Sequence, residues 1–269
     1  RKSDRSTASK TSVPLVNDPW KYQYLIRLSY LGFRYSGWQI QPGQKTVEGM
    51  LVKTLKYVLG DQPFKTLASG RTDAKVSSLS GACSLWLTQP LSGEISYWIE
   101  WINRNTPQDL KVESITEVPI DFNPIKNVVH KTYGYLFCCG DKPHPFTAPF
   151  MAHFSGDLDL NLMKKGAELY LGTHDFTHFT VRTAQKPNQS TLRTIDSCSL
   201  VNNDRWTANF FPSSSYIFWV TGHGFMRYQI RLMMGALVQL GRGEISMSDL
   251  SNALQGVPLP IPQYAAAGS

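Results

Sequence analysis

The sequence predicts an α+β protein with two ferredoxin-like halves, each with a mixed, mainly antiparallel sheet, helices packed on one face, and a central cleft between them. Strand-like and helix-like periodicities follow one another in the first half as strand, helix, strand, strand, helix, strand. A second series with a long apolar helix follows. With 269 residues, of which 42% are hydrophobic, the chain can bury a core in each half.

The first half is expected over residues 21–140. Thr46 is a suitable N-cap for its first helix, and Gly60 follows the last apolar residue of that helix. A Pro-rich segment, residues 140–150, marks the predicted boundary. The predicted elements, in order, are strand 22–32, helix 46–60, a strand within 64–73, strand 81–89, helix 94–103, strand 111–118 and strand 131–139.

The second half is expected over residues 141–269. Ser248 is the predicted cap of its last helix. Residues 1–20 are basic and rich in Ser and Thr, which predicts a flexible tail. We expect the protein in the cytoplasm, or in an organellar matrix if this tail is the remnant of a targeting segment. The predicted elements are helix 160–172, strands 190–201, 205–211 and 215–222, and helices 225–241 and 246–256.

Charge indicates the kind of partner. The chain has 27 Lys and Arg against 20 Asp and Glu, a net charge of +7, which favours a polyanion such as nucleic acid. We find no uninterrupted apolar stretch of membrane-spanning length, so no membrane partner is expected. We expect neither a metal nor a cofactor. No phosphate-loop or dinucleotide motif is present, and the four cysteines form no metal-binding pattern: Cys83, Cys138, Cys139 and Cys198.

The stretch LASGRTDAKVSS, residues 67–78, places Asp73 in a loop between two predicted strands. Two interpretations are open: a polar surface turn, or a nucleophilic carboxylate kept ionised in a cleft. A partly desolvated nucleophile needs a nearby cation, because burial alone raises the pKa of a carboxyl group. Arg231 is a candidate, because a guanidinium in an otherwise apolar helix is costly unless it is paired. The alternative is an arginine on the polar face of that helix.

Tyr133 and Tyr135 share one face of a predicted strand, either in the core or stacked on a nucleobase. His174 and His178 are four residues apart, for which we expect a structural role, with a metal hydrolase as the alternative. Cationic, aromatic and amide side chains in two loops suit phosphate contacts or an ordinary solvated surface: Arg34, Trp38, Gln39 and Lys45 in one, and Arg182, Lys186 and Arg193 in the other.

Five stretches share motifs with one family. SGRTDAKVSS is similar to G-R-T-D-A-G-V-H, YSGWQIQPGQKTVEG to G-W-Q-x-Q-P followed by T-V-x-G, and KTYGYLF to R-x-Y-x-Y. LGTHDFTHF is similar to L-x-G-x-H-D-F-x-x-F, and GHGFMRYQIRLMMGALVQLGRG to the helix that begins N-x-F-L-x-x-M-V-R. In this order, from Tyr24 to Gly243, they resemble the TruA family of tRNA pseudouridine synthases.

The resemblance implies a cofactor-free isomerase that detaches a flipped uracil from its ribose at N1 and rejoins it through C5. It implies that Asp73 is the attacking carboxylate, that Arg231 pairs with it, and that Tyr133 stacks on the uracil and moves the proton at C5. Arg71 would help to extrude the base. The substrates would be anticodon-arm uridines of tRNA, and the enzyme would be a homodimer.

The chain also departs from the family pattern. Ser77 stands where His is usual, Gly222 where Asn is usual, and FNPI, residues 122–125, lacks the Arg of F-H-A-R. Lys75 replaces a Gly, and Arg227 lies where a His pair is usual. The alternative function is therefore a catalytically inactive TruA-like module that binds RNA, such as ribosomal RNA, or assembles a ribonucleoprotein. The candidate RNA-binding residues are Arg71, Arg34, Trp38, Gln39, Lys75, Arg193 and Arg227.

Overall fold

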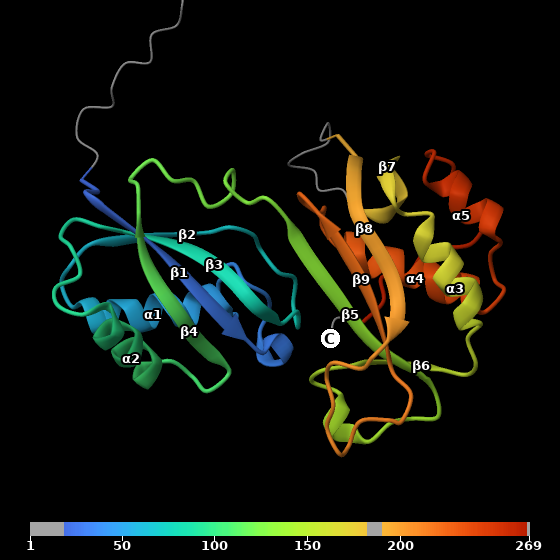
Figure 1. The fold of residues 1–269 in the computed structure, drawn as a ribbon, viewed down its shortest axis with the longest axis horizontal. Helices are drawn as coiled ribbons and strands as arrows, with labels where there is room; N and C mark the ends of the chain where they lie inside the picture. Colours follow the sequence, from blue (N-terminus) through green and yellow to red (C-terminus); the bar gives the residue numbers. More distant parts are fainter. Residues whose placement is uncertain (1–18, 182–189, 268–269) are drawn as a thin grey trace, which may run out of the picture.

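The computed structural model describes residues 19–181 and 190–267. Most of the predicted tail, together with Arg182 and Lys186, therefore lies outside the described residues. The described chain forms two sheets side by side, each with helices on one face (Figure 1). This arrangement confirms the predicted α+β class. Within the described ranges, no helix is long and apolar enough to cross a membrane.

The first half is a four-stranded, wholly antiparallel sheet in the order β2-β3-β1-β4 with two helices. Its βαββαβ chain order is that of a ferredoxin-like fold, as predicted. The Thr46 hydroxyl caps α1 by accepting a hydrogen bond from the Gly49 amide over 3.2 Å, which confirms the predicted cap. The elements are β1 Tyr22–Tyr30, α1 Val47–Leu59, β2 Phe64–Ala68, β3 Ser78–Leu87, α2 Ile95–Asn105 and β4 Leu110–Val118.

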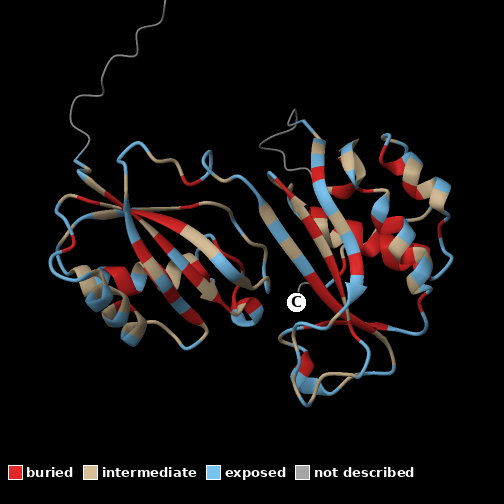
Figure 2. Ribbon diagram, in the orientation of Figure 1, coloured by how far each residue is buried: buried red, intermediate tan, exposed pale blue. Residues whose placement is uncertain are grey.

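The core of the first half follows from the strand and helix periodicities. Alternate residues of β1, Tyr24, Ile26 and Leu28, are buried in one cluster with Leu51 and Leu55 of α1. Figure 2 shows the buried residues along the strands and on the sides of the helices that face them. The core fixes the ends of β1 and β2, from which the loops of the candidate site emerge.

The second half is a five-stranded sheet in the order β6-β5-β9-β8-β7, with α3, α4 and α5 to one side (Figure 1). Only the β5–β6 pair is parallel, so this sheet is mixed. The extra strand β6 distinguishes it from the four-stranded sheet of the first half. The elements are β5 Lys131–Gly140, β6 Ala152–Ser155, α3 Leu160–Glu168, β7 Gly172–Asp175, β8 Leu192–Asn202, β9 Tyr216–Gly222, α4 Gln229–Gly241 and α5 Met247–Ala253.

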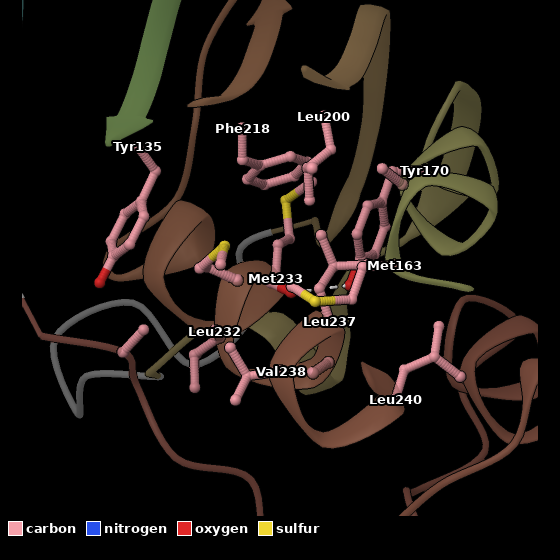
Figure 3. Close-up of a cluster of buried hydrophobic side chains, with 14 of the residues drawn as sticks. Tyr135, Met163, Tyr170, Leu200, Phe218, Leu232, Met233, Leu237, Val238 and Leu240 are labelled. Atoms are coloured by element: carbon pink, nitrogen blue, oxygen red, sulfur yellow. Dashed lines mark hydrogen bonds between the residues drawn. The ribbon is translucent and has the colours of Figure 1, made fainter. Parts of the chain in front are cut away.

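The helix α4 is the centre of the second core. It is buried from Leu232 to Gly241, which explains why its sequence is apolar on all sides. In Figure 3, side chains from the neighbouring strands and from α3 surround it, and the Tyr170 hydroxyl donates a hydrogen bond to the Met233 carbonyl over 3.0 Å. A helix packed this closely gives a rigid support to the residues in its first turn.

Strand β5 was expected to close the first half, but the structure places it in the second sheet. It pairs with β9 from Lys131 opposite Gly222 to Phe137 opposite Tyr216. The chain therefore passes between the halves within residues 119–130, before the predicted boundary. The periodicity of a strand shows which face is buried but does not identify its partners, and here the antiparallel partner β9 lies more than 70 residues away.

Two further predictions in the second half are wrong in detail. Residues 205–211 form a loop instead of a strand, and Trp206 and Phe211 pack against the apolar cluster on the outer face of the sheet. The last helix is capped by Ser246, not Ser248, because the Ser246 hydroxyl accepts a hydrogen bond from the Asp249 amide over 3.2 Å. Tertiary packing and cap geometry decided both features.

Candidate active site

A cavity of about 1270 Å³ lies between the two halves. Its walls come from the loop after β2, the segment before α1, strand β5 and the start of α4. Asp73, Tyr133 and Arg231 all line it, so the structure brings the three predicted catalytic residues together from distant parts of the sequence. Among the described residues, cations outnumber acids on its walls: Arg71, Lys131, Arg227 and Arg231 against Glu48 and Asp73.

The loop that carries Asp73 is anchored at the residue before it. The Trp38 amide donates a hydrogen bond to the Thr72 carbonyl over 3.0 Å, and the Tyr30 hydroxyl lies 2.8 Å from Thr72 Oγ1. Trp38, predicted as an RNA contact, is only 2% exposed, and its ring centroid lies 6.0 Å from that of Tyr30. From the core, Trp38 therefore supports the loop that carries Asp73.

The glycine of the Gly-Trp pair makes this brace possible. Gly37 has a positive φ of 96°, and a Cβ atom there would lie 2.8 Å from the Thr72 carbonyl oxygen. A larger residue would be strained and would also push the loop away. The Gly-Trp motif is thus explained by the close approach of two backbones beside Asp73.

The charge state of Asp73 depends on groups from the second half. Burial raises the pKa of its carboxyl group, and a hydrogen bond from the Tyr228 amide opposes this shift. The positive charges of Arg231 and Arg227 also favour the ionised form. No ion pair of the described residues joins Asp73 directly to Arg231, so the arginine acts on the carboxylate through space.

The start of α4 positions both arginines. Tyr228 has a positive φ of 61° and forms the N-cap, so the helix begins at Gln229, four residues later than predicted. The Tyr228 ring centroid lies 5.1 Å from Cζ of Arg227 and 5.0 Å from Cζ of Arg231. Nε of Arg231 also donates a hydrogen bond to the Ala266 carbonyl over 2.5 Å. Aromatic and backbone contacts therefore hold the guanidinium groups at the cavity.

The two tyrosines of β5 have different surroundings. The Tyr133 ring packs edge-on against Phe225, with ring centroids 5.1 Å apart. Burial and then the Asp73 charge raise the pKa of the Tyr133 phenol, which favours its neutral form. Tyr135 is buried, and its hydroxyl donates a hydrogen bond to the Ala267 carbonyl over 2.5 Å. One tyrosine lies beside the carboxylate, while the other anchors the C-terminal segment.

The structure separates the predicted RNA contacts. Arg71, Gln39 and Arg227 are exposed and line the cavity. Arg34 does not line it, because its guanidinium binds Asp109 with an Nη2–Oδ2 distance of 2.6 Å. Arg71, Gln39 and Arg227 are thus the exposed members of the predicted set that line the same cavity as Asp73.

Two departures from the family loop have a structural reading. Lys75 has a positive φ of 67°, a conformation that Gly adopts without strain, and its ammonium lies 6.0 Å from the Phe33 ring, outside the cavity lining. The Ser77 hydroxyl accepts a hydrogen bond from the Gly32 amide over 2.9 Å, which ties the end of the loop to the segment after β1. The lost Arg of the family pattern falls at Ile125, which lines the cavity.

Arg193, His174 and His178 all contact backbone carbonyl groups. Arg193 Nη1 donates to the Leu192 carbonyl over 2.6 Å. Nε2 of His174 lies 2.8 Å from the Leu171 carbonyl oxygen, and Nε2 of His178 lies 2.9 Å from that of Gly256. In the described ranges, no group of three or more His, Cys, Asp or Glu is placed to hold a metal. Both imidazole rings thus contact the backbone of neighbouring segments.

Several site residues were missed by the sequence analysis, above all Lys131. Its Nζ donates a hydrogen bond to the Ser69 carbonyl over 2.9 Å, from the second half to the Asp73 loop. Its position two residues before Tyr133 was a signal, since residues i and i+2 share a strand face. The sequence did not show that this face meets a loop of the other half. The remaining missed residues are Tyr30, Thr72, Phe225 and Tyr228.

Comparison with known proteins identifies the family. Residues 167–267 match the family described as tRNA pseudouridine synthase. The tRNA pseudouridine synthase A of Bacillus sp. (strain KSM-64) is 32% identical over 222 residues, 82% of this chain and 85% of that protein. Those of Solibacter usitatus and Limosilactobacillus fermentum are 31% and 28% identical, each over 87% of this chain and over 93% and 87% of their own lengths. The chain therefore belongs to the TruA family of tRNA pseudouridine synthases, which are isomerases.

Proposed function

We propose that this protein converts uridine to pseudouridine in the anticodon arm of tRNA, with Asp73 as the nucleophile. The observation that carries the proposal is the convergence of Asp73, Tyr133 and Arg231, from both halves, on one cavity. The excess of cations on the walls suits a polyanionic substrate, since Lys and Arg gain affinity by releasing phosphate counterions. The inactive RNA-binding alternative is not favoured, because all three residues are retained.

The chemistry needs no electron donor or acceptor. The bond from C1′ to N1 breaks, the bond from C1′ to C5 forms, the proton on C5 passes to water, and N1 gains a proton from water. Asp73 attacks as an ionised carboxylate, and the bond that it forms breaks again before the product leaves. Burial raises the pKa of Asp73, while the Tyr228 amide and the charges of Arg231 and Arg227 favour its ionised form. The neutral phenol of Tyr133 is a weak base, so this geometry favours stacking on the uracil over removal of the C5 proton.

Exposed cations on the cavity wall would hold the RNA backbone around the flipped base. Arg71 and Arg227 are the candidates, because both are exposed and line the cavity. Loss of one phosphate contact should reduce the slope of log Kd against log salt concentration by about one. The homodimer implied by the family is part of the same proposal, and light scattering of the protein with and without tRNA measures it.

The test is pseudouridine formation in a pool of tRNA transcripts, mapped to the nucleotide. Asp73→Asn keeps the side-chain size and removes the charge, so we expect loss of product with tRNA binding retained. Asp61→Asn makes the same change at an exposed turn after α1 and should leave the activity intact. Product at anticodon-arm uridines supports the proposal. Tight RNA binding without product from the unmodified protein would instead establish the non-catalytic alternative.

A further inference from the structure

We propose that Lys131 is a positioning residue that clasps the two halves together and sets the distance between Asp73 and Tyr133. The clasp joins the first residue of β5 to the loop that carries the carboxylate. Its catalytic consequence depends on the proposed function, whereas its structural consequence does not.

The contact is short and specific. Nζ of Lys131 donates a hydrogen bond to the Ser69 carbonyl over 2.9 Å, four residues before Asp73 in the chain. The neighbouring Gly70 has no side chain, and a Cβ atom there would lie 2.7 Å from the same Nζ. The loop backbone therefore leaves the space that the ammonium occupies.

The same strand face carries the residue that meets the substrate. Lys131 and Tyr133 are two residues apart on β5, so both side chains project from one face. Lys131 holds the loop at Ser69, and Tyr133 lies close enough to Asp73 for the carboxylate charge to raise the pKa of its phenol. A shift of the loop along or away from β5 would change the position of the carboxylate relative to the tyrosine ring.

The packing between helices and strands does not oppose such a shift. Within the described chain, every extensively packed pair of helices or strands lies inside one half. The Tyr228 amide and the charges of Arg231 and Arg227 act on the Asp73 carboxyl group of the same loop from the second half. The hydrogen bond from Lys131 to Ser69 therefore holds this loop against the second half.

The ammonium is costly at this place. Lys131 is half-buried and, among the described residues, belongs to no ion pair. Burial lowers the pKa of its amino group, which reflects the cost of desolvating the charge. A neutral apolar side chain would avoid that cost but could not hold the Ser69 carbonyl. The hydrogen bond to the Ser69 carbonyl gives the half-buried ammonium a structural role.

The experiment compares Lys131→Met, which keeps the length of the side chain, with Lys131→Arg, which keeps a cationic donor. Single-turnover pseudouridine formation and the tRNA Kd at several salt concentrations are measured for each. We expect the Met variant to lose about 10²-fold in rate, as for a misplaced catalytic group, with the Kd and its salt dependence unchanged. Arg should recover most of the rate. Lys53→Met, an exposed charge on α1, is the control.

Hydrogen exchange at the amides of residues 69–76 in the RNA-free protein tests the clasp without any activity. Exchange should be faster in Lys131→Met than in the unmodified protein and close to normal in Lys131→Arg. An unchanged rate and unchanged exchange would overturn the clasp. Weaker tRNA binding, with a slope of log Kd against log salt concentration reduced by about one, would show instead that Lys131 contacts a phosphate. If the unmodified protein forms no pseudouridine but Lys131→Met still exchanges faster at residues 69–76, the proposed function is wrong and the clasp is supported.

Discussion

The hydroxyl of Tyr35 donates a hydrogen bond to the Asp109 carboxylate over 2.5 Å. Arg34 donates two more to the same carboxylate, which is only 7% exposed, over 3.0 and 2.6 Å. The Tyr35 carbonyl in turn accepts a hydrogen bond from the Lys75 amide over 3.1 Å. Asp109 therefore holds the segment that braces the loop of Asp73, although it lies outside the lining of the cavity that Asp73 lines.

Asp109→Asn should destabilise the protein by about 2 kcal/mol at neutral pH, because hydrogen bonds to a charged group are lost. Burial acts to raise the pKa of Asp109, but the hydrogen bonds from Tyr35 and Arg34 outweigh it, so the pKa is lowered. This stability is present above the unfolded pKa and is lost as the pH falls through the folded pKa. Urea unfolding should show the difference between the two proteins closing in acid, with Asp61→Asn as control. An Asp109→Asn variant as stable as the unmodified protein at neutral pH would contradict this role.

Lys75→Gly should raise the free energy of unfolding by about 0.5–1 kcal/mol. The gain is the relief of the positive φ, reduced by the greater chain entropy of Gly in the unfolded state. Lys75→Ala removes the same charge but keeps the Cβ atom, so it should give no such gain in chemical unfolding. Pseudouridine formation should be unchanged in both. Weaker tRNA binding in both would show that Lys75 contacts RNA.

Replacement of Arg231 by Gln should move the acid limb of the rate–pH profile to higher pH. The rate falls as Asp73 becomes protonated, and loss of the Arg231 charge leaves the burial that raises the pKa of Asp73 less opposed. Single-turnover rates across the acid limb measure the shift. Arg104→Gln on α2, whose partner is Glu100, is the control and should not move it. An unmoved limb in the Arg231 variant would mean that Arg231 does not act on the Asp73 charge.

Tyr135→Phe should slow the reaction about tenfold and destabilise the protein by about 1 kcal/mol. The lost hydroxyl holds the Ala267 carbonyl, and the preceding carbonyl, that of Ala266, holds Nε of Arg231. Thermal unfolding, the single-turnover rate and the tRNA Kd are measured together, and the Kd should be unchanged. Tyr170→Phe removes another buried hydroxyl of the same core, and it should lower the stability without slowing the reaction. Equal single-turnover rates for both variants would show that the Tyr135 hydroxyl does not help to position Arg231.

The sequence by itself determined the features that depend on neighbours in the chain. Strand alternation and helical spacing identified the ferredoxin-like half, and the Thr46 cap was visible because a cap is a local hydrogen bond. The apolar residues of α4 predicted a buried helix. The motif around Asp73 pointed to the family because five stretches occur in the same order.

Only the tertiary structure decided which distant residues meet. It assigned β5 to the second sheet, made residues 205–211 a covering loop, and drew Lys131 to the Ser69 carbonyl of the other half. It also buried Trp38, a predicted RNA contact, and placed its amide against the loop of Asp73. The physical reason is the same in each case: strand pairing, burial and through-space charge depend on groups far apart in sequence, and a local pattern holds no record of them.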